Sequence, residues 1–177
     1  MTNLDHWHPY LPPIEWLRLW RGAGTWQQRD RDTAARVILA AELMSQDNGA
    51  DAAAHALAGT RAEVHHSALI AVYFLAASFA VSPGRDALLA DLASDAGVVG
   101  AEVLALADAI ADYLPDTEAT EIEQTGLYLQ MKAVSSRDSA PILAHLMVAV
   151  RLLGLLWRDR PGTFDDARHA YGKGWVA

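Results

Sequence analysis

Three histidines in apolar surroundings offer the most readily argued chemistry in this chain. His65 and His66 stand at the start of a long uncharged stretch, and His145 interrupts a second apolar stretch. Imidazole exchanges a proton near neutral pH and is also a common metal ligand. If the fold brings His145 to face His65 or His66, the three rings form a polar spot inside an apolar protein, and such spots bind ligands. We therefore predict His65, His66 and His145 as a candidate ligand-binding site.

Glu63 and His66 raise the possibility of metal binding. Their E-x-x-H spacing puts a carboxylate and an imidazole on one helix face, as in di-iron four-helix bundles. Residue counts alone give about one acid-x-x-His pair in a chain of this composition. The chain has three, at Asp5–His8, Glu63–His66 and Asp166–His169. Because Glu63 and Asp166 also suit helix capping, we predict no metal and no cofactor, and keep a metal site as an alternative.

Arg61 and His66 suggest a third chemistry. Their R-x4-H spacing resembles the motif of HEPN ribonucleases, small all-helical proteins that build a composite site from two subunits. The resemblance implies ribonuclease activity with Arg61 and His66 as the catalytic residues. It covers these two residues, and Ala62 stands where that motif usually has a polar residue. No nucleophile elbow, phosphate-binding loop or dinucleotide fingerprint is present in the sequence.

The stretch from Thr60 to Val81 must position His65 and His66. Thr60 and Glu63 stand in the T-x-x-E arrangement of a capping box, which marks a helix start. The fifteen residues from Ser67 to Val81 carry no charge. As a helix they would span about 22 Å, less than the ~30 Å hydrocarbon core of a bilayer. We therefore predict the buried central helix of a soluble domain over residues 60–81.

The remaining elements also read as helices. A second strongly apolar helix is predicted over Pro141–Trp157, and no strand alternation is visible. Shorter helices are predicted over 13–22, from 25 to about 46, and over 51–58, 85–96, 98–114, 116–133 and 163–172. Asp47-Asn48-Gly49 is a turn signal, Asp51 can cap the helix after it, and Gly97 is expected to close the helix over 85–96. The helix over 98–114 has one predicted apolar stripe, formed by Val99, Val103, Leu106, Ile110 and Tyr113. At 177 residues, one domain is the expectation. The prediction is an all-α single-domain bundle, residues 1–177, of about seven to nine helices.

Composition narrows the setting of the protein. Hydrophobic residues make up 52% of the chain, which is typical of a folded protein. With no cysteine, disulfides and thiolate chemistry are excluded. The N-terminus lacks the basic and apolar regions of a signal peptide. We predict a cytoplasmic protein without membrane attachment.

The charge is unevenly distributed. Residues 86–131 contain ten acidic residues and no Lys, Arg or His, so their net charge is −10. Because the whole chain has a net charge of −8, the remaining residues carry +2. Such a surface repels phosphates, and no direct nucleic-acid binding is expected. It is either a solvated face or a docking surface for a basic partner. The predicted interface residues within it are Asp112, Asp116, Glu118 and Glu121.

An aromatic N-terminal segment, residues 1–24, is the second candidate for an interface. Trp16 and Trp20 lie in a short predicted helix whose apolar residues are spread too widely for one stripe. Tryptophan is common in cores and enriched at interface hot spots. We predict that the segment packs on the bundle or on a second subunit, giving a homodimer.

These features favour a non-enzymatic protein that binds another protein, or its own copy, through the acidic surface and the aromatic N-terminus. The alternative is a helical bundle with an internal histidine-containing site for a small ligand, a metal or HEPN-like ribonuclease chemistry.

Overall fold

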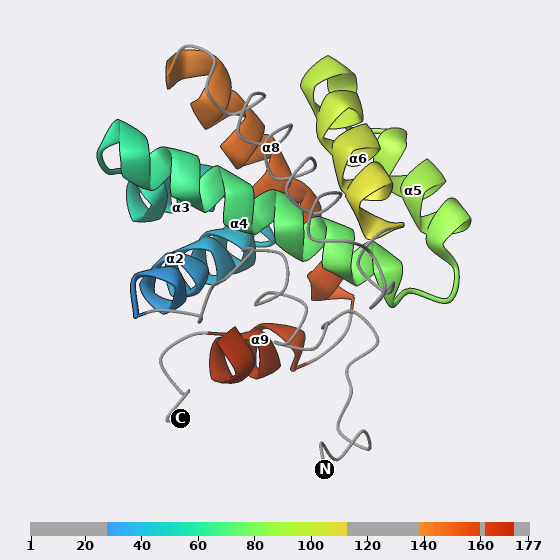
Figure 1. The fold of residues 1–177 in the computed structure, drawn as a ribbon, viewed down its shortest axis with the longest axis horizontal. Coiled ribbons are helices and arrows are strands. Elements are labelled where there is room, and N and C mark those ends of the chain that lie inside the picture. Colours follow the sequence, from blue (N-terminus) through green and yellow to red (C-terminus); the bar gives the residue numbers. More distant parts are fainter. Residues whose placement is uncertain (1–27, 113–138, 160–161, 172–177) are drawn as a thin grey trace, which may run out of the picture.

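The computed structural model describes residues 28–112, 139–159 and 162–171, and within these ranges every regular element is a helix (Figure 1). The described helices are α2 (Gln28–Met44), α3 (Ala50–Leu57), α4 (Arg61–Ala80), α5 (Arg85–Ala93), α6 (Gly97–Ala111), α8 (Ser139–Arg158) and α9 (Thr163–Tyr171). The predicted all-α bundle is confirmed. The helices predicted over 13–22 and 116–133, and the aromatic segment 1–24, lie outside the described residues.

Helix α4 is the centre of the bundle, and its start is set by local hydrogen bonds. The Thr60 N–H donates to Glu63 Oε2 at 2.7 Å, and the Glu63 N–H donates to the Thr60 hydroxyl oxygen at 3.3 Å. This is the predicted capping box. From Ser67 to Phe79 every residue except the half-buried Leu69 is buried. The prediction of a helix enclosed on all sides is confirmed for this part.

Length and apolar composition would also allow α4 to cross a membrane, and it is the one described helix for which this holds. A core helix passes the same test. Of its most apolar 18 residues, 67% are buried within the bundle. The covering helices are α2, α6 and α8, which all pack against α4. The packing is therefore that of a core helix.

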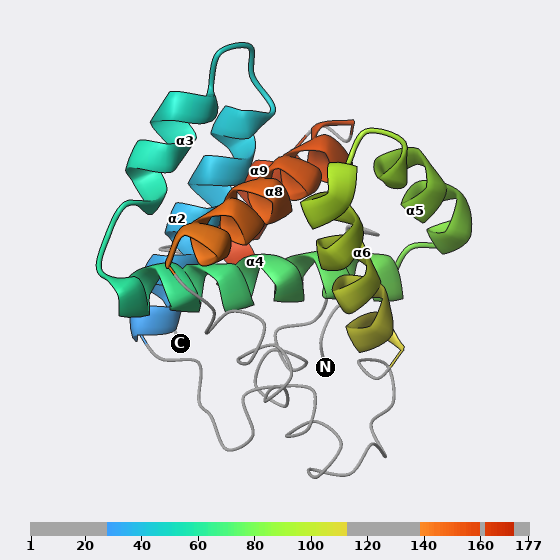
Figure 2. The same ribbon diagram turned by 90° about the horizontal axis from the view of Figure 1, so that it is seen from above.

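The other helices are divided between the two ends of α4. Helices α2 and α3 lie towards its N-terminal end, whereas α5 and α6 lie at its C-terminal end (Figure 2). Helix α8 runs between the two groups and packs against α2, α4 and α6. Helix α9 packs against α2 and α8. The N-terminal turns of α4 are thus placed beside α2.

Trp157 joins α8 to α4 in the core. Its side chain is fully buried, and the indole N–H donates to the Ser78 hydroxyl at 3.2 Å. Ser78 in turn donates to the Phe74 carbonyl oxygen at 2.7 Å. The indole also packs against the rings of Phe74 and Phe164, each with a centroid distance of 5.9 Å. A buried indole N–H needs such a partner, and a serine in the apolar helix supplies it.

A glycine allows α8 to approach α2 closely. A Cβ atom added to Gly154 would lie 2.4 Å from the Ala41 carbonyl oxygen, far inside ordinary contact distance. Only glycine fits at this crossing. The position of α2 relative to the core therefore depends on the absence of a side chain at residue 154.

Two predicted helix boundaries are wrong. Asp51 was expected to cap α3, but the N-cap is Gly49 and Asp51 lies inside the first turn. The turn before it was correctly predicted, and Asn48 adopts a left-handed conformation there with φ 62°. Helix α5 ends at Ala93 rather than at residue 96, and Gly97, with φ 68°, begins α6 instead of closing α5.

The buried face of α6 is rotated from the predicted one. The prediction placed Val99, Val103, Leu106 and Ile110 on one stripe, and of these Val99 and Leu106 are only half-buried. The face that meets the core is formed by Gly100, Val103, Leu104, Ala107, Ile110 and Ala111. Small residues occupy half of this face, so the backbone of α6 can approach its neighbours closely.

Candidate functional site

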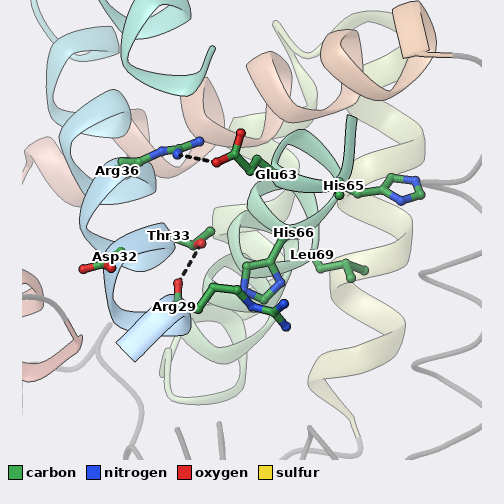
Figure 3. A pocket seen from close by; sticks show the side chains of 9 residues that line it. Arg29, Asp32, Thr33, Arg36, Glu63, His65, His66 and Leu69 are labelled. Carbon is green, nitrogen blue, oxygen red and sulfur yellow. Dashed lines mark hydrogen bonds and ion pairs between the residues drawn. The ribbon is translucent and has the colours of Figure 1, made fainter. Parts of the chain in front are cut away.

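A pocket of about 710 Å³ lies between α2 and the first turns of α4 (Figure 3). Most of its lining side chains are polar or charged. The lining residues are Arg29, Asp32, Thr33 and Arg36 from α2, and Ala62, Glu63, His65, His66 and Leu69 from α4. The volume is in the range of sites that bind small molecules.

The first turns of α4 can line a pocket because they are exposed or half-buried, whereas the rest of the helix is buried. Residues 61–63 are exposed, residues 64–66 are half-buried, and full burial starts at Ser67. The capping box fixes where the helix begins, and Glu63 and His66, three residues apart, therefore share a face. His65 and His66 both line the pocket, but their rings point in different directions (Figure 3).

Four residues of α2 line the pocket, and three of them form a stripe along the helix. Arg29, Thr33 and Arg36 follow one another at spacings of four and three, so they lie along one side of the helix. The Thr33 hydroxyl donates to the Arg29 carbonyl oxygen at 2.9 Å. Figure 3 shows the two arginines on either side of Thr33, with Arg36 extended towards Glu63 and Arg29 beside His66.

An ion pair between Asp30 and His66 connects the two walls. His66 Nε2 lies 3.0 Å from Asp30 Oδ1, and the Asp30 side chain is only 1% exposed. A carboxylate buried to this degree needs a hydrogen-bonded or charged partner. The sequence did carry a signal for Asp30, since it stands three residues before Thr33 and seven before Val37, on the buried side of α2.

Arg36 has hydrogen-bonding capacity to spare. Its Nη1 lies 3.9 Å from Glu63 Oε1, which is an ion pair without hydrogen-bond distance. Its Nε and Nη2 atoms are buried and have no hydrogen-bond partner among the described residues. Arg29 is exposed and makes no ion pair within the described ranges. The guanidinium groups of the pocket thus have donors available.

The carboxylates of the pocket are already bonded. Asp32 accepts a hydrogen bond from the Gln28 side chain at 3.0 Å. Glu63 accepts the Thr60 N–H, and this hydrogen bond, aided by the positive charge of Arg36, lowers the pKa of Glu63 below its ordinary value. Both carboxylates keep their charge and further acceptor sites. The Nε and Nη2 atoms of Arg36 are nevertheless buried without a partner in the described ranges, and such donors suit a ligand that carries acceptor oxygens.

The predicted site residues are separated into two places. His65 and His66 share the pocket, whereas His145 pairs with Glu102 between α8 and α6, with 3.1 Å between His145 Nε2 and Glu102 Oε2. Arg61 is exposed in the first turn of α4 and is not among the pocket-lining residues. The three histidines are therefore not brought together. Arg61 does not line the pocket with His66.

Within the described ranges, no group of three or more His, Cys, Asp or Glu residues could hold a metal ion. Sequence reasoning missed Arg29 and Arg36, because nothing in the spacing of α2 alone indicates which helix lies opposite it.

The acidic segment has counter-charges from outside its own sequence. Arg85, the residue just before it, donates to Asp108 Oδ1 and Asp112 Oδ1, each at 2.8 Å. Burial alone would lower the pKa of Arg85, but these hydrogen bonds raise it overall. Of the predicted interface residues, Asp112 is thus paired within the chain. Trp16, Trp20, Asp116, Glu118 and Glu121 lie outside the described residues.

No protein-family model, curated protein or solved structure matches this chain. Any function must therefore be supported by the geometry of the site itself.

Proposed function

We propose that this protein binds a small anionic molecule in the pocket between α2 and α4. The observation that carries the proposal is Arg36, whose Nε and Nη2 atoms are buried beside the pocket without a hydrogen-bond partner in the described ranges. A buried donor without a partner costs about 1–3 kcal/mol, and more when the group is charged. A ligand oxygen would remove that cost once a small shift of the Arg36 side chain presents these atoms to the pocket.

The chemistry of the guanidinium group favours an oxyanion. Its fork of N–H donors matches the two oxygens of a carboxylate or the oxygens of a phosphate, and such charge-assisted hydrogen bonds are strong. Glu63 Oε1 lies 3.9 Å from Arg36 Nη1, beyond hydrogen-bond distance, so Glu63 competes only weakly for Arg36. The proposal is one of binding and assigns no catalytic step.

Thermal denaturation and calorimetric titration with inorganic phosphate and small carboxylates test the proposal. A ligand present at 100 times its Kd stabilises the fold by about 2.7 kcal/mol, which raises Tm by several degrees. Arg36→Gln should abolish the shift. Arg151→Gln, which removes the same charge from an exposed position on α8, is the matched control and should retain it. Equal shifts in both variants would contradict the proposal.

A second candidate is binding of a basic protein partner through α5 and the turn that follows it. Asp86, Asp91 and Asp95 are exposed and make no ion pair within the described residues, and the nearby Val98 is 81% exposed. Changing the three aspartates to asparagine should release a co-purifying basic partner at low salt while leaving Tm unchanged. Retention of every co-purifying protein would remove this candidate.

We also propose that the chain self-associates through its aromatic N-terminus. Sedimentation of the full chain at micromolar concentration should give a homodimer, and Trp16→Ala with Trp20→Ala should give a monomer. A monomeric wild-type chain would contradict this.

A further inference from the structure

The two arginines of the pocket are about two helical turns apart along α2. Arg29 and Arg36 are seven residues apart, which corresponds to about 10.5 Å between their backbone positions along the helix axis. Figure 3 shows their side chains on either side of Thr33, and the two guanidinium groups do not meet at one point. In this arrangement a single small oxyanion is not expected to accept hydrogen bonds from both.

Each arginine offers a distinct anion-binding end. At one end, Arg36 has its buried Nε and Nη2 atoms available, and Glu63 holds Nη1 only at 3.9 Å. At the other end, Arg29 makes no ion pair within the described ranges and lies beside His66, which is itself held by the buried Asp30. The carboxylate of Asp30 therefore faces His66 and not the ligand.

Part of the pocket lining is apolar, because Ala62 and Leu69 contribute apolar surface from α4. The Thr33 hydroxyl uses its hydrogen for the Arg29 carbonyl oxygen, so towards a ligand it can only accept a hydrogen bond. This part suits a short apolar or hydroxyl-bearing linker.

We infer that the ligand carries two anionic groups joined by a linker, one group bound by Arg36 and the other by Arg29. This inference rests on the proposed function and specifies its ligand class. Both groups are oxyanions. The pocket selects ligands by the distance between these two groups.

Calorimetric titration with a series of α,ω-dicarboxylates from malonate to azelate tests this inference. The matched controls are monocarboxylates of the same chain length. Affinity should rise with length to an optimum beyond succinate and then fall. At the optimum, the dicarboxylate should bind about tenfold or more tightly than its monocarboxylate, because the second group binds intramolecularly.

Arg29→Gln is the decisive variant, since the side chain is exposed and its loss should leave folding intact. It should reduce the optimal dicarboxylate to the affinity of the monocarboxylate and remove the dependence on length. Arg36→Gln should weaken both compounds.

The possible failures are distinguishable. If phosphate or monocarboxylates bind through Arg36, but no dicarboxylate binds better or Arg29→Gln changes nothing, the two-anion inference is overturned and the proposed function stands. If no anion binds at millimolar concentration, both are overturned.

Discussion

The molecule contains two histidine–carboxylate pairs of nearly equal length in very different surroundings. Asp30 and His66 are 3.0 Å apart between α2 and α4, and Glu102 and His145 are 3.1 Å apart between α6 and α8. The Asp30 side chain is 1% exposed, whereas that of Glu102 is 55% exposed. Distance alone therefore says little about the energetic weight of such a pair. Burial of the carboxylate decides how much the fold depends on its partner.

The largest expected effect comes from removing the imidazole of the buried pair. His66→Ala removes the contact between the imidazole and the buried Asp30 carboxylate, and this should lower the free energy of unfolding by up to about 3–5 kcal/mol. Urea denaturation measures the loss. His145→Ala is the matched control and should cost much less. Equal losses in the two variants would contradict the distinction between the pairs.

A double-mutant cycle sharpens the same comparison. Asp30→Ala combined with His66→Ala should cost less than the sum of the single substitutions, because the buried carboxylate that loses its contact with His66 is no longer present. The expected coupling is about 0.5–3 kcal/mol. The corresponding cycle for Glu102 and His145 should give a coupling near zero. Additive effects of Asp30 and His66 would show that their proximity has no energetic consequence.

The exposed pair should respond weakly and in a salt-dependent way. Glu102→Gln is expected to change the free energy of unfolding by no more than about 1 kcal/mol, since solvent screens the interaction. Denaturation at low and at high salt should show that this small difference fades as the Debye length shortens. A loss that persists at 1 M salt would mean that Glu102 stabilises the fold through packing instead.

Glu63 gives the smallest expected effect, and its cause is hydrogen bonding and not burial. Its pKa is lowered from the ordinary 4.5, mainly by the Thr60 N–H. A lowered folded-state pKa means that the stabilisation is present above the unfolded-state pKa and is lost as pH falls through the folded-state value. Between pH 6 and pH 3, the wild-type chain should therefore lose more stability than Glu63→Gln. Parallel pH profiles would contradict this assignment.

Local signals in the sequence were sufficient for much of the fold. The T-x-x-E arrangement at Thr60 and the uncharged run after Ser67 correctly predicted the start and the burial of α4. Where two local signals competed, the prediction was wrong. Asp51 is a good N-cap residue, but Gly49 begins the helix two residues earlier, directly after the left-handed Asn48. Both choices satisfy local chemistry, and the turn geometry decides between them.

The candidate site was predictable only in part, because it depends on how helices face one another. His65 and His66 were identified from sequence, and both line the pocket. Asp30 was overlooked although an acidic residue at a core position of α2 calls for a partner. Arg29 and Arg36 look like ordinary solvated residues until α4 is placed beside them. The partner of His145 is likewise set by tertiary packing.

The close approach of α8 to α2 at Gly154 sets the position of one wall of the pocket, although Gly154 does not line the pocket. Helix α2 carries Arg29 and Arg36, and its backbone lies against α8 where an added Cβ would meet the Ala41 oxygen at 2.4 Å. In a Gly154→Ala variant, an ordinary distance of about 3.4 Å between the new Cβ and the Ala41 oxygen would require α2 to move by roughly 1 Å. The absence of a side chain at Gly154 therefore determines where α2, with Arg29 and Arg36, lies relative to the core. If the proposed anion binds in this pocket, a substitution at Gly154 should change which anions fit, although Gly154 does not line the pocket.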